Sequence, residues 1–305
     1  MGKKNKENDV ISDGTRAINK FRVSDVIIML VIGILSLTCI LPFIHVAAKS
    51  LSSNGYVTAK EVFFWPKGFT FDAYRSLFED GSLTYSMGYS VKLTLIFTLL
   101  GMLVCTCAAY PLSKKRLKGR SVFTFLLMVP MYFGAGLLPT YLLYNDLHLL
   151  DTMWVLIWPL IYSAYNMLIM KNFFMSSIPD ELEESAFLDG ASNFQILWKI
   201  VLPLSKPILA TLSLFYAVGR WNSYSDNMYY IRSHNLKMAQ YKLYEMILNA
   251  QEAASTSLTE ATNVTSTPEV LQAASIMFVT VPILIIYPFV QKYFVKGTMV
   301  GAVKG

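Results

Sequence analysis

The sequence predicts an all-α protein, a polytopic transmembrane bundle of six helices. Composition is the first reason: 54% of the residues are hydrophobic, only 15% are charged, and the mean hydropathy is +0.44. Soluble globular domains carry about 25% charged residues. The second reason is the placement of the charges, because long uncharged runs alternate with short charged segments. Each run has the length of about 20 residues that one bilayer crossing needs.

Six segments are expected to cross the membrane, in the order 26–48, 87–112, 121–144, 152–170, 203–221 and 271–291. Backbone groups in hydrocarbon must pair within their own segment, so each crossing is expected to be helical. The first run is too long for a signal-peptide core and no small-residue cleavage site follows it, so it is expected to stay as the first span. Prolines within the later spans are expected to kink these helices rather than break them.

The Lys and Arg residues predict the orientation. Seventeen of them lie in or beside the segments 1–25, 113–120, 172–202 and 292–305, against seven in the segments 49–86 and 222–270. Under the positive-inside rule, these segments face the cytoplasm, so both termini of this multi-pass cell-membrane protein are cytoplasmic. Residues 26–291 then form the transmembrane domain, with extracellular loops at 49–86 and 222–270. A net charge of +6 placed beside apolar runs suits membrane orientation better than nucleic-acid binding.

The three cysteines give no sign of a metal or disulfide role. Cys39, Cys105 and Cys107 all lie inside apolar runs, and no His or Cys cluster accompanies them. They are interpreted as small apolar residues of packed or lipid-facing helices.

The cytoplasmic loop 172–202 is the most informative segment. Ser177 followed by Asp180 is similar to a capping-box start, and Pro179 fits a first helical turn. Asp189-Gly190 is a turn signal that should end this helix. A second short helix over 192–200 is expected to place four apolar residues on one face, namely Phe194, Leu197, Trp198 and Val201. The pattern indicates two short surface helices joined by a glycine bend, a shape that a partner's groove could hold.

These residues also carry a family resemblance. The stretch Glu184-Ser185-Ala186-Phe187-Leu188-Asp189-Gly190-Ala191, followed by Ile200-Val201-Leu202-Pro203 and Pro207, resembles the EAA coupling motif of ABC importer permeases. Ser185 replaces the usual first alanine, a small-for-small change. The tail 291–305 is similar to the maltose-type branch of carbohydrate permeases. The resemblance implies the type I ABC importer permease fold.

The same resemblance implies a set of partners. They are a second homologous permease subunit, two cytosolic ATPase subunits and an extracellular solute-binding protein that delivers a carbohydrate. The resemblance favours an oligosaccharide over a monosaccharide. It implies contact with the ATPase for six residues: Glu184, Ala186, Asp189, Gly190, Ala191 and Pro203. The sequence has no G-x-x-x-x-G-K-[ST] phosphate loop, so ATP is expected to be bound by a partner subunit. This chain is thus expected to be a transport subunit without an ATPase site or a cofactor of its own.

A dense polar and aromatic group lies at the end of the fifth predicted span, and two interpretations of it stay open. The residues are Tyr216, Arg220, Trp221, Asn222 and Tyr224, with Asp226 close by. They could form an interfacial aromatic belt with an arginine anchor. They could instead line the outer mouth of a solute pathway.

The sequence disfavours two other classes of protein. An ion-coupled secondary transporter of small polar solutes usually carries ionisable residues in its spans, whereas the six predicted spans contain no Asp or Glu. This disfavours proton coupling and leaves a carbonyl-lined Na⁺ site open. A membrane enzyme is disfavoured because His45, His148 and His234 are far apart in sequence, and no H-E-x-x-H or G-x-S-x-G motif occurs.

Overall fold

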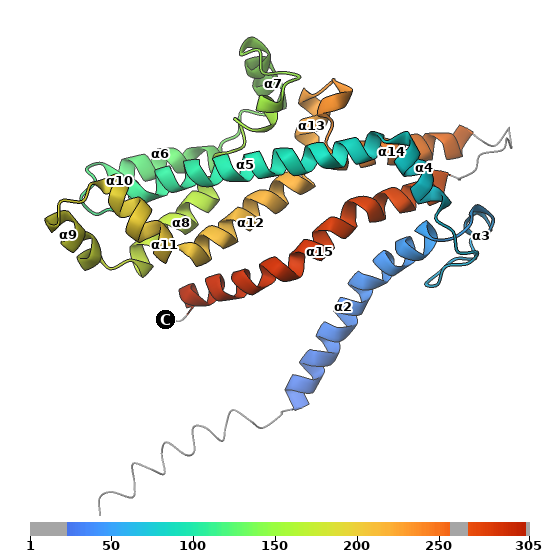
Figure 1. Ribbon diagram of the computed structural model, residues 1–305, viewed down its shortest axis with the longest axis horizontal. Coiled ribbons are helices and arrows are strands. Elements are labelled where there is room, and N and C mark those ends of the chain that lie inside the picture. The colour runs from blue at the N-terminus through green and yellow to red at the C-terminus, as the bar shows by residue number, and fades with distance from the viewer. Residues whose placement is uncertain (1–22, 257–267, 303–305) are drawn as a thin grey trace, which may run out of the picture.

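The protein folds as an elongated array of helices (Figure 1). The computed structural model describes the backbone of residues 23–256 and 268–302, with side chains for 25–252 and 268–288. Of the expected cytoplasmic segments, residues 1–22 and 303–305 lie outside the described residues. Within the described ranges the regular elements are helical, and one isolated antiparallel bridge joins Ser52 to Phe69.

Three helices are long and apolar enough to cross a membrane: α2 (Val23–Ser50), α5 (Ser82–Ser113) and α15 (Pro268–Ala302). They coincide with the first, second and last predicted spans. At about 1.5 Å per residue, the 32 residues of α5 extend about 48 Å, longer than a bilayer core of about 30 Å. In Figure 1, α5 runs along the length of the molecule, from α4 at one end to α10 at the other.

The third predicted span is bent, whereas all but the first three residues of the fifth, 203–221, lie in one helix. Helices α6 (Arg120–Tyr132) and α7 (Leu137–Asp146) meet at 111°, so the prediction of one kinked helix over 121–144 is wrong. Gly136 at the break has φ +83°, a left-handed conformation that glycine adopts freely. The second bend, of 85°, separates residues Asn193–Leu204 from α12 (Lys206–Asn222).

The fourth predicted span, 152–170, is not one helix. A 3₁₀ turn, Met153–Leu156, is followed by non-helical backbone that contains Pro159. Helix α8 (Ala164–Ser177) then starts at Ser163, whose hydroxyl accepts a hydrogen bond from the Asn166 amide at 3.3 Å. Its 14 residues extend about 21 Å, short of a bilayer core. By length and composition, the described residues thus provide three spans, or up to five if each bent pair counts as one.

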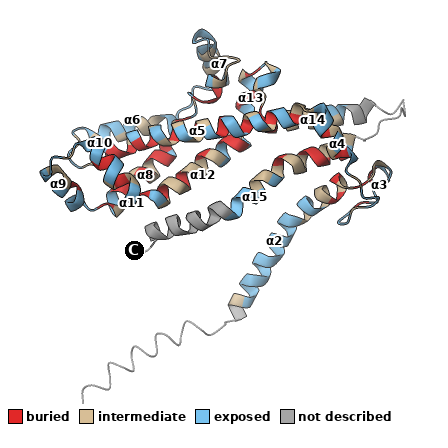
Figure 2. Ribbon diagram, in the orientation of Figure 1, coloured by how far each residue is buried: buried red, intermediate tan, exposed pale blue. Residues whose placement is uncertain are grey.

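The main hydrophobic core lies where α5, α8 and α12 pack together (Figure 2). Its fully buried members include Leu93, Leu156, Met167, Met170 and Leu212. A smaller core at the opposite end joins the ends of α2 and α15 to α4 (Asp72–Asp80) and α14 (Ala239–Thr256). The short helices α3 (Asn54–Thr58) and α13 (Ser225–Tyr230) also lie toward that end, and α7 and α13 project from the array (Figure 1).

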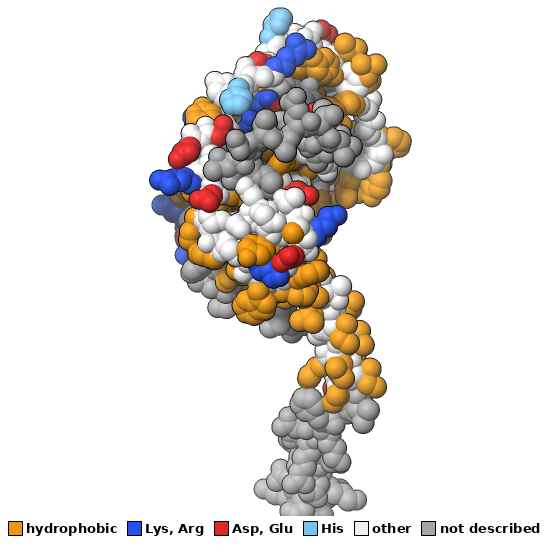
Figure 3. All heavy atoms as spheres, turned by 90° about the vertical axis from the view of Figure 1, so that its right-hand side faces the viewer, with side chains coloured by type: hydrophobic (Ala, Val, Ile, Leu, Met, Phe, Trp, Pro, Cys, Tyr) orange, Lys and Arg blue, Asp and Glu red, His pale blue; other side chains and the backbone are white. Residues whose placement is uncertain are grey.

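Helix α2 stands apart from both cores over most of its length. None of its most apolar window is buried within the chain. Figure 3 shows it as a column that carries hydrophobic side chains around its surface, exposed in this chain from Val26 to Ile44. A helix that is apolar all round needs lipid or another protein against it.

Candidate functional site

The loop between α8 and α12 folds as two helical segments separated by Gly190. Helix α9 (Asp180–Leu188) ends in a Schellman motif: the Ala191 amide donates to the Ala186 carbonyl at 2.9 Å, and the Gly190 amide to the Phe187 carbonyl at 3.0 Å. Gly190 has φ +82°, the left-handed conformation that this motif requires. The prediction that Asp189-Gly190 ends the first helix is confirmed.

The predicted start of this helix is wrong. Ser177 is the last residue of α8, and the N-cap of α9 is Pro179, which makes no side-chain cap. A full capping box lies instead at α10 (Asn193–Ile196), where the Gln195 amide donates to Ser192 Oγ and the Ser192 amide to Gln195 Oε1. The acidic first turn of α9 still suits the positive end of the helix dipole.

One side of this loop packs against the helical bundle. Ala186, Phe187 and Ala191 are half-buried against the main core. In the second segment, Leu197 and Val201 are buried in the same core. The loop is therefore a packed part of the bundle, and the alanines of the motif face inward.

The other side of the loop is exposed and carries large apolar side chains among polar and charged ones. Leu188 is 90% exposed, Phe194 71% and Trp198 64%. The last two rings stack, with centroids 6.2 Å apart. The expectation that Phe194 and Trp198 share a face with Leu197 and Val201 is wrong, because the two pairs lie on opposite sides. We call Glu184, Leu188, Asp189, Phe194 and Trp198, all exposed, the outer face of the loop.

Pro203 marks the exit from the loop. It lies in α11 (Leu202–Leu204), directly after a π turn, Leu197–Val201. Proline has no amide hydrogen to donate and its ring crowds the carbonyl four residues before it. The wider π turn relieves that crowding, and the Ser205 amide then bonds to the Val201 and Leu202 carbonyls.

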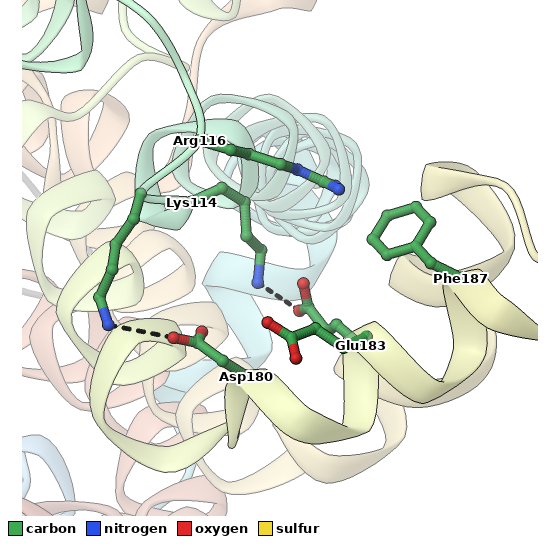
Figure 4. Close-up of a pocket in the computed structure, with 7 residues that line it drawn as sticks. Lys114, Arg116, Asp180, Glu183 and Phe187 are labelled. Atoms are coloured by element: carbon green, nitrogen blue, oxygen red, sulfur yellow. Dashed lines mark hydrogen bonds and ion pairs between the residues drawn. The ribbon is translucent and has the colours of Figure 1, made fainter.

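Three consecutive basic residues directly after the end of α5 form ion pairs and hydrogen bonds with this loop (Figure 4). Lys114 forms an ion pair with Glu183, in which both side chains are nearly buried. Lys115 pairs with Asp180 at 3.0 Å in an exposed position. The Arg116 guanidinium donates to the Asn193 side chain and lies 4.2 Å from the centre of the Phe187 ring. These contacts were missed from the sequence, although an acidic run at 180–184 and a basic run at 114–116 on the same predicted side were a usable signal.

The candidate pathway residues occupy different environments. Tyr216 is buried against Gly101, where an added Cβ would lie 2.8 Å from its ring, and against Phe97. Trp221 is buried beside a groove of about 110 Å³ whose other walls include Leu214, Val218 and Ile283. This groove is apolar, which suits an acyl chain better than a sugar.

Asn222 and Tyr224 are exposed, in contrast to the buried Tyr216 and Trp221. The Tyr224 ring stacks on Tyr244 of α14, with centroids 5.2 Å apart. Of the five predicted lining residues, these two are the ones that this chain presents to its surroundings.

Arg220 is fully buried and tied to three other segments. Its guanidinium donates to Asp226 Oδ2 at 2.5 Å, to the Leu156 carbonyl at 3.0 Å and to Met238 Sδ at 3.2 Å. The Ser223 hydroxyl donates to the other oxygen of Asp226 at 2.7 Å. In this chain Arg220 therefore holds the α12–α13 corner together, whereas either interpretation from the sequence required it at the surface.

A second polar link lies near that corner. The Ser233 hydroxyl donates to Asp151 Oδ2 at 2.6 Å, and the Ser233 and Arg232 amides donate to Asp151 Oδ1. The hydroxyl contact, helped by the amides and partly opposed by burial, holds the pKa of Asp151 below its ordinary value.

Comparison with known proteins gives a consistent result. Residues 98–300 match the family described as "Binding-protein-dependent transport system inner membrane component". Two proteins of Bacillus subtilis (strain 168) align over nearly their whole length. Protein LplC is 38% identical over 93% of this chain and 96% of its own. The polygalacturonan/rhamnogalacturonan transport system permease protein YtcP is 39% identical over 94% of this chain and 100% of its own.

A solved structure is similar as well. It is a chain in the crystal structure of a bacterial ABC transporter involved in the import of the acidic polysaccharide alginate. The TM-score is 0.82 and the sequence identity 34%, over 90% of this chain and 99% of that chain.

Proposed function

This chain belongs to the family of binding-protein-dependent transport system inner membrane components, and from that premise we propose that its cargo is an oligosaccharide. The chain is a permease subunit of an ABC importer and is not itself an enzyme. Its fold is that of a type I importer permease. An importer of this family works with a partner permease, an ATPase and a solute-binding protein. The ion-coupled alternative has no support from the family.

The outer face of the loop is the observation that carries the mechanism. It presents three large apolar side chains and two carboxylates on a loop whose opposite side packs against the bundle. Apolar clusters of this kind on a protein surface mark sites of contact with another protein. We infer that this face fits the groove of a cytosolic ATPase, one copy for each permease subunit. The six residues expected from the motif then divide, with Glu184 and Asp189 contacting the ATPase while Ala186, Gly190, Ala191 and Pro203 shape and anchor the loop.

Transport would proceed by alternating access. Closure of two ATPase subunits on ATP would push the loop, and α8 and α12 would move because they are joined to its two ends. On this proposal the loop, the N-terminal segment and the C-terminal tail lie in the cytoplasm, and the Lys and Arg distribution supports that orientation.

The substrate proposal rests on the relatives. One imports polygalacturonan or rhamnogalacturonan by its name, and the similar crystal structure is of an alginate importer. Polygalacturonan, rhamnogalacturonan and alginate are all acidic, so oligosaccharides that contain uronic acids are the first candidates. The exposed Asn222 and Tyr224 are the residues of this chain that we propose to line the path.

Cross-linking tests the ATPase contact. In a background without Cys39, Cys105 and Cys107, Asp189→Cys is expected to cross-link to an ATP-hydrolysing subunit of the assembled importer. Asp146→Cys, exposed at the end of α7, is the matched control and should not cross-link. Equal labelling at both sites, or none at Asp189, contradicts the proposal.

Uptake into proteoliposomes tests the substrate. With the cognate binding protein outside and ATP inside, the importer should accumulate a galacturonate oligosaccharide in preference to a neutral malto-oligosaccharide. Uptake of the neutral sugar alone would remove the acidic-substrate proposal. Uptake that is indifferent to ATP and abolished by a proton ionophore would contradict the importer mechanism itself.

A further inference from the structure

We propose that the basic residues 114–116 clamp the loop between α8 and α12, which we call the coupling loop (172–202), to the end of α5. In this way α5 is a third element that the ATPase moves, beside α8 and α12. This proposal rests on the proposed function, since it assumes that the loop receives the motion of the ATPase. Lys114 and Glu183 are its positioning residues. Neither belongs to the outer face of the loop.

The buried pair is the strongest part of the clamp. The Lys114 side chain is 12% exposed and that of Glu183 is 7% exposed, and Figure 4 shows the ammonium group pointing at the carboxylate between α5 and α9. The same ammonium lies 4.7 Å from the centre of the Tyr110 ring, one turn back on α5. A buried charge that loses its partner is strongly unfavourable. Separation of α9 from α5 would leave two such charges, so the two helices are expected to move together.

The neighbouring residues extend the grip to both arms of the loop. Lys115 contacts Asp180 at the start of α9, while Arg116 contacts Phe187 near the end of α9 and Asn193 at the start of α10. The clamp therefore holds the segments on both sides of Gly190. A loop attached to the bundle only by its chain ends could rotate about Gly190 without moving α5, and these contacts oppose that rotation.

Helix α5 is suited to pass the motion on. It is one continuous helix of 32 residues that packs against α12 and α8 in the main core. Its other end belongs to the second core, through Leu83, and Ser90 Oγ accepts a hydrogen bond from the Ala239 amide at the start of α14 at 2.8 Å. Coupling between distant sites needs a physically connected element of this kind. The clamp joins the coupling loop to the far end of the molecule through one helix.

The test measures movement at the far end of α5 in the fully assembled importer. Spin labels are placed at Tyr85 of α5 and Leu284 of α15, both exposed, in the cysteine-free background. Their distance distribution is recorded without nucleotide and with ATP plus vanadate. We expect Lys114→Met and Glu183→Gln each to reduce the nucleotide-driven shift more than twofold. The reversed pair Lys114→Glu with Glu183→Lys should restore most of it. Lys118→Met, exposed in the turn between α5 and α6, is the matched control and should behave as the wild type.

Each outcome decides the proposal. An unchanged shift in both single variants overturns it, as does a reversed pair that performs no better than the singles, because a merely space-filling role would not respond to charge reversal. If the single variants do not assemble, the reversed pair must restore both assembly and the shift, and failure to do so overturns the proposal. Absence of any nucleotide-driven shift in the wild type, together with no cross-link at Asp189, would instead refute the proposed function.

Discussion

Gly190 sets the angle between the two arms of the coupling loop through its backbone alone. An added Cβ would meet no atom within 4 Å, so the constraint is its φ of +82° and not space. Gly190→Ala is expected to destabilise the turn by about 1 kcal/mol, while Gly190→Asn, which tolerates this conformation better, should cost less. We expect uptake per ATP hydrolysed to fall in the order glycine, asparagine, alanine.

Gly33→Ala is the matched control, since Gly33 also has open space around its Cβ position but no positive φ. It should leave the uptake per ATP unchanged. Equal effects at Gly33 and Gly190 would show that backbone conformation is not the cause.

The Arg220–Asp226 pair is expected to dominate the stability of the α12–α13 corner. Asp226→Ala leaves a buried guanidinium without its counter-ion, which should cost about 3–5 kcal/mol and lower the midpoint of thermal unfolding in nanodiscs. The exposed Arg75–Glu79 pair is the control, and Arg75→Ala should cost less than about 1 kcal/mol. Comparable losses at the two sites would contradict the role given to Arg220.

Asp151 gives the region beside the α12–α13 corner a dependence on pH. Its pKa in the folded chain is lowered, so its link to Ser233 contributes stability above the unfolded value of about 3.9 and loses it as pH falls through the lowered folded value. The Arg232 and Ser233 amides should therefore stay protected against hydrogen exchange at pH 6 and lose protection as the pH falls below about 3.9 toward the lowered folded value, after correction for intrinsic rates.

In Asp151→Asn, which cannot titrate, that change with pH should be absent. A pH response that persists in this variant would mean that another group is responsible.

At the scale of single helices, α2 is the element that depends least on the rest of the chain. Ile34 lies near its middle and is exposed. Ile34→Lys should weaken insertion of α2 by about 2.5–3.5 kcal/mol, because the charge would lie deep in hydrocarbon. Ile27→Lys lies near the end of the helix, where a lysine can extend to the interface, and should be tolerated. Insertion is measured as the fraction of a glycosylation reporter that is translocated; equal fractions for both variants would contradict a spanning α2.

Hydrophobicity predicted which segments are apolar but not how each is divided into helices. The runs 26–48, 87–112 and 271–291 became single helices although they contain Pro42, Pro111, Pro282 and Pro288. In 121–144, Gly136 takes a left-handed conformation, and in 152–170 a 3₁₀ turn and Pro159 precede α8. Average apolarity over a window is the same for a straight helix and for two bent pieces, so these breaks could not be placed from hydropathy.

At the scale of the whole molecule, the contacts that define the site join residues far apart in the sequence. The clamp connects residue 114 to residue 183, and Arg220 reaches the carbonyl of Leu156 and the sulfur of Met238. The motif located the coupling loop and its Gly190 turn, because both are local patterns. It could not distinguish the outward Leu188 from the inward Ala186, because that depends on where the bundle lies. The two cores show why: the described chain buries its α5–α8–α12 contacts and one side of the loop, but leaves α2 and the outer face of the loop, which Figure 2 colours largely as exposed, for other surfaces.

The π turn at Leu197–Val201 has a consequence for loop length. A π turn contains one residue more than an α turn, and each residue of an α-helix rotates the chain by about 100°. Deletion of one residue there would leave Phe194 and Trp198 on the same side but swing the start of α12 round by that angle. The number of residues between Gly190 and Pro203 therefore sets the direction in which α12 leaves the loop. A loop with one residue fewer would turn α12 toward a different neighbour.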